Sequence, residues 1–154
     1  MADSKRQQIV DKIKARFGAI LQENGYATDI GKNVYFWRTV ALGQNNLPAI
    51  ICRDRLRTDW GTIGAWDRYL DVEIEMYLKP DISGDFDGAD YVMRQVLADL
   101  ETAVGSDVKW DDLAEDTHVI ENPEIDIAAR DNVYVAALAR MTVEYQTLPW
   151  NPYQ

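Results

Sequence analysis

Residues 69–78 place the strongest constraint on the fold, because apolar and polar side chains alternate along them without a break. Neighbouring side chains of a β-strand point to opposite faces of a sheet. The pattern therefore predicts a strand with one face in a core and the other open to water or covered by a partner. The core positions are Leu70, Val72, Ile74, Met76 and Leu78, and the outward positions are Asp71, Glu73, Glu75 and Tyr77.

The N-terminal segment has the periodicity of an amphipathic helix. Its apolar residues recur at spacings of three and four, which predicts a single apolar stripe. Ser4 suits the N-cap because Gln7 follows three residues later, and Gly25 suits the end because glycine accepts the left-handed conformation. We expect a helix over residues 4–23, with Phe17 among its most buried residues.

The other elements follow from local composition. β-Branched and aromatic residues predict strands at residues 34–40, 47–53, 118–121 and 132–147, and the alanine run in the last segment leaves a helical alternative. A short helical turn is an option at residues 107–113. Helical spacing predicts a second helix over residues 88–104, with an apolar face formed by Tyr91, Val92, Val96, Leu97, Leu100 and Val104.

Grouped strands with helices outside the group favour an α+β fold. We expect a mainly antiparallel or mixed sheet of about five strands, with two main helices packed on one face. The length of 154 residues suits one domain over residues 1–154.

Charge excludes some classes of partner. The chain has 16 lysines and arginines against 26 aspartates and glutamates, a net charge of −10. This balance argues against binding to nucleic-acid phosphates or to an anionic membrane surface. No apolar run reaches the roughly 18 residues of a membrane span, and the N-terminus lacks the apolar region of a signal peptide. We expect a soluble protein of the cytosol.

Aromatic and arginine residues mark candidate protein interfaces. Residues 56–68 contain two glycines and two tryptophans, and Arg55, Arg57 and Arg68 flank these tryptophans. A proline-broken tail is present at residues 148–154. Tryptophan and arginine are enriched where protein partners bind most strongly. We interpret residues 56–68 as a mobile arm or a long hairpin tip; in the alternative, the rings cover the domain's own core edge. The interface candidates are Arg55, Arg57, Trp60, Trp66, Arg68, Trp150 and Tyr153.

Asp71, Glu73 and Glu75 are weak candidates for a metal site. Alternation puts them on one strand face about 7 Å apart, and hard cations such as Mg²⁺ prefer oxygen ligands. A metal-dependent enzyme is one interpretation. The other is a solvated face, or acids opposite basic residues of a neighbouring strand or subunit. We expect no cofactor beyond loosely bound Mg²⁺.

Other reactive side chains give no catalytic pattern. His118 is the one histidine and no nucleophile motif accompanies it, so we expect a surface histidine and no enzyme. Cys52 lies in an apolar run, which predicts a buried and inert thiol.

The order, length and pattern of these segments resemble the tail terminator proteins of long-tailed bacteriophages, the minor tail protein U-like group. The features that carry the resemblance are the helix that begins at residues 6–11, the strands at 47–54 and 70–75, the helix around 97–101 and the closing strand at 141–147. Other small neck or tail-completion adaptors share similar features and form the alternative.

The resemblance implies an α+β domain that forms a homo-hexameric ring on the finished tail tube. Such a ring stops tube polymerisation and presents the surface to which the head joins. The implied partners are further copies of the chain, the tail tube protein and head-completion or connector proteins, with DNA only as cargo and no membrane. The implied location is the neck end of the virion tail, after assembly in the host cytoplasm.

Overall fold

The computed structural model describes residues 2–60, 64–79, 88–119, 124–128 and 134–154. Two α-helices and six strands lie within these ranges, which confirms the α+β class. They are α1 (Lys5–Gly18), β1 (Val34–Phe36), β2 (Ala49–Asp59), β3 (Trp66–Leu78), α2 (Ala89–Gly105), β4 (Asp116–Val119), β5 (Glu124–Ala128) and β6 (Tyr134–Thr147).

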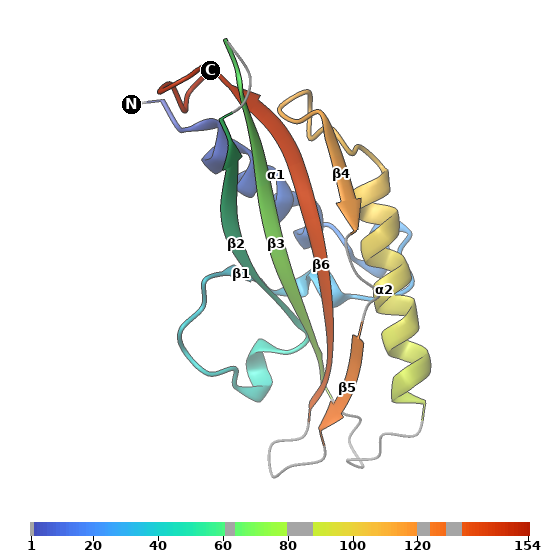
Figure 1. Cartoon of the computed structure of the whole chain (residues 1–154). Helices are drawn as coiled ribbons and strands as arrows, with labels where there is room; N and C mark the ends of the chain where they lie inside the picture. The colour runs from blue at the N-terminus through green and yellow to red at the C-terminus, as the bar shows by residue number, and fades with distance from the viewer. Residues whose placement is uncertain (1, 61–63, 80–87, 120–123, 129–133) are drawn as a thin grey trace.

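One mixed sheet contains all six strands, and five of them follow the order β1-β2-β3-β6-β4 (Figure 1). The sixth strand, β5, pairs with residues 134–138 of β6, whereas β4 pairs with residues 141–144 of the same strand. β1 runs parallel to β2, and every other pairing is antiparallel. The pairing of β3 with β6 extends from Trp66 opposite Thr147 to Leu78 opposite Val135. The sheet is therefore mainly antiparallel, as predicted.

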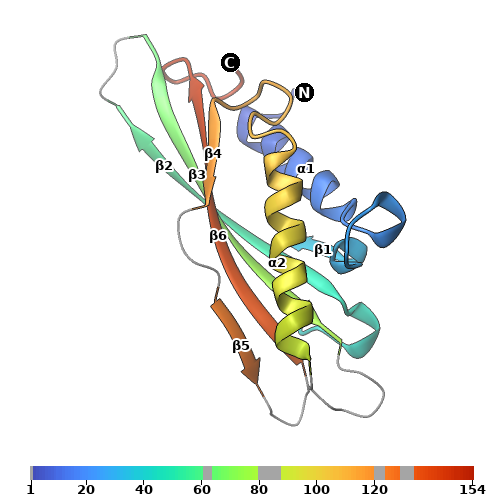
Figure 2. The same cartoon turned by 90° about the vertical axis from the view of Figure 1, so that its right-hand side faces the viewer.

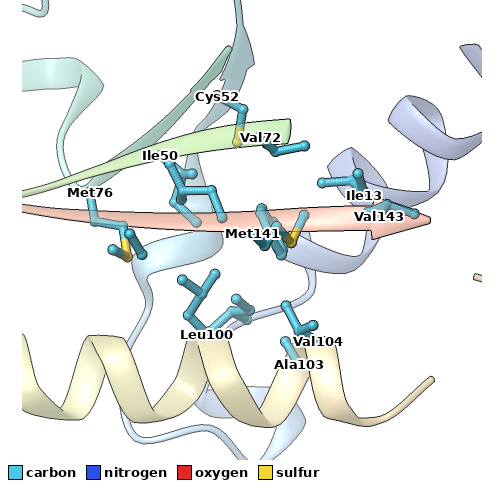
Figure 3. Packing of buried hydrophobic residues seen from close by; sticks show 14 of the residues in the cluster. Ile13, Ile50, Cys52, Val72, Met76, Leu100, Ala103, Val104, Met141 and Val143 are labelled. Atoms are coloured by element: carbon cyan, nitrogen blue, oxygen red, sulfur yellow. The ribbon is translucent and has the colours of Figure 1, made fainter. Parts of the chain in front are cut away.

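Both helices cover the same face of the sheet (Figure 2). The alternation in β3 is confirmed, since Leu70, Val72, Ile74 and Met76 are at most 1% exposed. Figure 3 shows side chains of β3 and β6 gathered with Leu100, Ala103 and Val104 of α2 and with Ile13 of α1. The opposite face carries the acids of β3, and none of the helices in the described ranges covers it.

The first helix begins as predicted but ends early. The Ser4 hydroxyl accepts a hydrogen bond from the Gln7 N–H (3.2 Å), and the buried stripe includes Phe17. The predicted end at residue 23 is wrong, because the Ile20 carbonyl accepts the N–H of Gly31 instead of continuing the helix. Gly25 is left-handed, as expected, but it closes a separate 3-10 turn (Gln22–Asn24).

Several strand boundaries differ from the prediction. β1 stops at Phe36 instead of residue 40, because Trp37 takes a positive φ of 53° and turns the chain away. β2 continues to Asp59, which pairs with Asp67 of β3, so much of the predicted arm at residues 56–68 is a paired hairpin. Residues 61–63 lie outside the described residues.

The C-terminal strands are partly as predicted. β6 confirms the strand interpretation over the helical one, and the predicted residues 132 and 133 lie outside the described residues. β4 begins two residues earlier than expected, with Asp116 pairing with Glu144. β5 was not predicted.

The second helix is confirmed, but its predicted apolar face is wrong at two positions. Met93, Val96, Leu100 and Val104 are buried, whereas Tyr91 is 63% exposed and Val92 is 41% exposed. Each helical residue turns by about 100°, so Tyr91 lies on the side opposite Met93.

The predicted helical turn at residues 107–113 is a run of tight turns. Trp110, Asp111 and Asp112 have φ values of 52°, 57° and 63°. The Trp110 ring is fully buried, where its Nε1 donates to the Thr117 hydroxyl (2.8 Å) and Arg16 lies 3.8 Å from the ring centre.

Candidate functional site

The open face of the sheet carries charges that are paired across the strands. Arg53 lies opposite Glu73 and also bonds to Glu75. Arg57 donates to Asp71 at 2.5 Å, and Arg140 of β6 lies 3.7 Å from Glu73. The three acids predicted on one strand face therefore meet basic residues of neighbouring strands, as one of the interpretations expected.

This pairing bears on the metal candidates Asp71, Glu73 and Glu75. Their oxygens bond to guanidinium groups, and no cluster of three or more histidine, cysteine, aspartate or glutamate side chains within the described residues converges to hold an ion. A resident cation needs ligands from several elements. Here the three acids come from one strand, β3, and each already lies beside an arginine of a neighbouring strand.

A shallow hollow of about 570 Å³ opens on this face at the edge of β2. Its lining includes Trp37, Arg53, Arg55, Asp71 and Arg140. Arg55 is exposed and lies opposite Asp71, and it has no hydrogen bond or salt bridge with another described residue. The hollow thus leaves an arginine available to an external acidic group.

Trp37 borders this hollow and was not a site candidate in the sequence. Its ring is 58% exposed, yet its Nε1 donates to the carboxylate of Asp54 (2.7 Å). Arg6 of α1 contacts the other oxygen of Asp54 at 2.6 Å. A left-handed φ is uncommon for so bulky a residue, and sequence pattern gave no signal for it.

Asp71 accepts hydrogen bonds from side chains of both neighbouring strands, Arg57 of β2 and Thr142 of β6. The hydrogen bond from Arg57, followed by that from the Thr142 hydroxyl, lowers the pKa of Asp71 below its ordinary value of 3.8. Because the folded pKa lies below the unfolded one, the stabilisation is present above about pH 4 and is lost as the pH falls through the folded value.

We expect Asp71→Asn to reduce the acid sensitivity of folding. From about pH 6 to about pH 3, the free energy of unfolding should fall less in the variant than in the parent, by about 1 kcal/mol or less for a partly exposed pair. Urea unfolding at each pH measures it. Identical pH profiles would mean that the Asp71 interactions add nothing to stability.

Three tryptophans gather where the hairpin meets the C-terminal tail. The Trp66 ring lies edge-on to Trp60 with centres 4.4 Å apart, and edge-on to Trp150 at 4.8 Å. Trp60 and Trp150 are 6.0 Å apart. The structure thus joins candidates from two segments that are far apart in the sequence.

Exposure divides this tryptophan cluster of Trp60, Trp66 and Trp150 into two roles. Trp66 is 8% exposed and forms the floor, so the interpretation that rings cover the core edge holds for it. Trp60 and Trp150 are 60% and 82% exposed. Edge-on aromatic pairs add roughly 0.5–1.5 kcal/mol beyond burial, so the exposed rings are held in a defined arrangement.

The remaining interface candidates lie around this cluster or away from it. Arg68 lies 5.2 Å from the Trp66 ring centre and donates to the Thr58 and Thr147 hydroxyls. Tyr153 is 51% exposed in the tail. Arg57 instead lies over Tyr69 beside Asp71, and Arg55 lines the hollow.

His118 and Cys52 occupy the predicted environments. His118 is exposed, with its Nε2 3.5 Å from Asp116 and 3.6 Å from Glu144. Cys52 is fully buried, and burial raises the pKa of its thiol far above the ordinary range. The two side chains lie on opposite sides of the sheet layer and form no catalytic pair.

No protein-family model matches this chain, and a search of curated proteins finds no significant match. In the part of the chain that the structure describes, no helix has the length and apolar character needed to cross a membrane.

Proposed function

We propose that this protein is a structural component of a bacteriophage or prophage that closes the tail tube as a hexameric ring and joins it to the head. The observation that carries the proposal is the exposed pair of rings, Trp60 and Trp150, fixed on the buried Trp66. Large rigid aromatic groups open to water suit contact with another protein.

The position of the tryptophan cluster supports a docking role. The β2–β3 hairpin and the C-terminal tail meet at one end of the long sheet (Figure 1). The tail is tied to the start of α1, because Lys5 donates its N–H to the Pro152 carbonyl (2.9 Å). A cluster held at one end of an elongated subunit is suited to meet a tube or a head-side connector.

The acidic composition is compatible with DNA as cargo. A net charge of −10 on each copy repels phosphates, so DNA would slide through a ring without sticking. In this proposal the partners are other copies, the tail tube protein and head-completion proteins. The ring is located at the neck end of the tail, following assembly in the host cytoplasm.

Sedimentation velocity and negative-stain electron microscopy test the proposal. A ring gives a species of about six times the 17.6 kDa chain mass, with six-fold symmetric particles. The measurement is made over a range of protein concentration and salt, alone and with tail tubes polymerised from the tube protein of the same genome. A chain that stays monomeric throughout and leaves the tubes uncapped would overturn it.

We expect Trp60→Ala combined with Trp150→Ala to leave the fold intact and to weaken binding to tail tubes at least about tenfold, because both exposed rings are lost while Trp66 remains. Co-sedimentation with tubes measures binding, and circular dichroism measures folding. Tyr91→Ala is the matched control, since it removes an exposed aromatic ring from α2. Unchanged binding, or loss of folding in the double variant, would contradict a docking role for these rings.

A further inference from the structure

We infer that copies of this chain join edge to edge, with the free edge of β2 on one copy pairing with the outer edge of β4 on the next. The inference rests on the proposed ring and names the contact between its subunits. It follows from the backbone groups, the strand order and the charges at the two edges of the sheet.

The edge of β2 is unpaired beyond the end of β1. The Ile50 N–H donates to the Asn33 carbonyl, and the Cys52 carbonyl accepts from Trp37, so the even-numbered residues of β2 face this edge. The register of β2 with β3 is unbroken to Asp59. Leu56 and Thr58 therefore present their N–H and C=O groups outward, without a backbone partner among the described residues.

The pairing of β1 with β2 stops at Trp37. Its left-handed backbone turns the chain away from β2, and its hydrogen bond to Asp54 holds it there. An unpaired strand edge is a ready template for another strand. On the open face, this edge is lined by the exposed arginines Arg55 and Arg57, and by Asp59 at the end of the strand.

β4 lies at the opposite edge of the sheet, and its residues are in line with the unpaired residues of β2. Arg55 lies opposite Asp71, Asp71 opposite Thr142, and Thr142 opposite His118. In the adjacent row, Arg57, Tyr69, Glu144 and Asp116 follow one another across the sheet. Residues in the unpaired part of β2 and residues in β4 therefore lie in line with one another across the sheet, at its two opposite edges.

The directions of the strands allow β2 of one copy to pair with β4 of a second copy. The four strands β2, β3, β6 and β4 alternate in direction, because each pairing between them is antiparallel. When a second copy is related to the first by rotation about an axis along the strands, its β4 runs antiparallel to β2. Antiparallel strands pair directly.

Charge favours this contact over pairing of like edges. The β2 edge presents Arg55 and Arg57, with Asp59 at its end. The β4 edge presents Asp116, whose carboxylate also accepts the Thr117 N–H (2.8 Å), with Glu115 beside it and Glu144 behind it. When β2 faces β4 in this register, Arg57 meets Asp116, whereas arginines meet arginines when β2 faces β2. A contact between two different edges repeats from copy to copy and closes into a ring when the rotation fits.

Cysteine cross-linking of the full chain tests the contact. Arg55→Cys and His118→Cys place one thiol at each edge on the open face, and both sites are exposed. Arg53→Cys and Arg57→Cys, each combined with His118→Cys, sample neighbouring registers. The native thiol of Cys52 is fully buried, so oxidation reports on the introduced thiols.

We expect at least one double variant to give a ladder of covalent multimers that stops at about six chains. The single variants, and Arg55→Cys combined with Lys14→Cys on the exposed side of α1, should stay without a ladder. Rings in sedimentation without any ladder would overturn the edge contact and leave the proposed function standing. A ladder without closed rings would support the edge contact and overturn the hexamer.

Hydrogen exchange gives a second measurement that needs no variant. Amides of Leu56 and Thr58 should exchange at least about tenfold more slowly in the oligomer than in the dilute monomer, because they gain carbonyl acceptors. Equal exchange rates in the two states would overturn the contact, whatever the cross-links show.

Discussion

Replacing Phe17 by alanine is expected to lower the free energy of unfolding by about 3–5 kcal/mol, the usual range for a fully buried phenylalanine. Phe17 is 0% exposed and lies on the α1 stripe with Ile9 and Ile13, in the core shared with both helices and the sheet. The loss combines the hydrophobic transfer of the ring with the cavity that it leaves. Urea unfolding followed by circular dichroism measures the change.

Lys14→Ala provides the matched control in the same helix, because Lys14 is exposed and its change should stay within about 0.5 kcal/mol. A cost below about 1 kcal/mol for Phe17→Ala would mean that the stripe is not packed as described, and that α1 is oriented differently on the sheet.

The fold was predictable where a periodic pattern coincided with a long element. The alternation in β3 set both the strand and its buried face, because a shift by one residue would expose every apolar side chain. The failures are local. Trp37 and Trp110 have left-handed backbones that depend on tertiary partners, namely Asp54 and Thr117.

The candidate site was predictable in composition and not in arrangement. Sequence selected Trp60, Trp66 and Trp150, but their contact depends on how the tail folds against the hairpin. Residue type alone also gave no means to separate the buried Trp66 from its exposed neighbours.

The charged face depended on strand register. The acids of β3 were assigned to one face correctly, yet their partners come from β2 and from Arg140 of β6, which requires the pairing of three strands. For the same reason the free edge of β2 was not predictable, since it exists only because β1 stops at Phe36.

Gly31→Ala is expected to destabilise the chain by about 3 kcal/mol or more, although it adds a single methyl group. A Cβ at this position would lie closer than van der Waals contact to the Phe17 carbonyl oxygen, and 2.9 Å from the Ile20 nitrogen and oxygen. All three atoms belong to the backbone, so no side-chain rotation relieves the overlap. The Gly31 N–H also bonds to the Ile20 carbonyl at 3.0 Å, so separation of the segments would break that bond.

Gly105→Ala is the matched control, because a Cβ there meets no atom within 4 Å at the end of α2. Alanine should be neutral at that site or stabilise it by up to about 1 kcal/mol, since it loses less backbone entropy on folding. Thermal unfolding should separate the pair, with Gly31→Ala lowering the midpoint by roughly 6–12 °C or more for a domain of this size. If both variants melt with the parent, the close approach of Gly31 to the end of α1 is wrong. The account of why α1 ends at Gly18 would then fail with it, because that account depends on the same contact between Gly31 and Ile20.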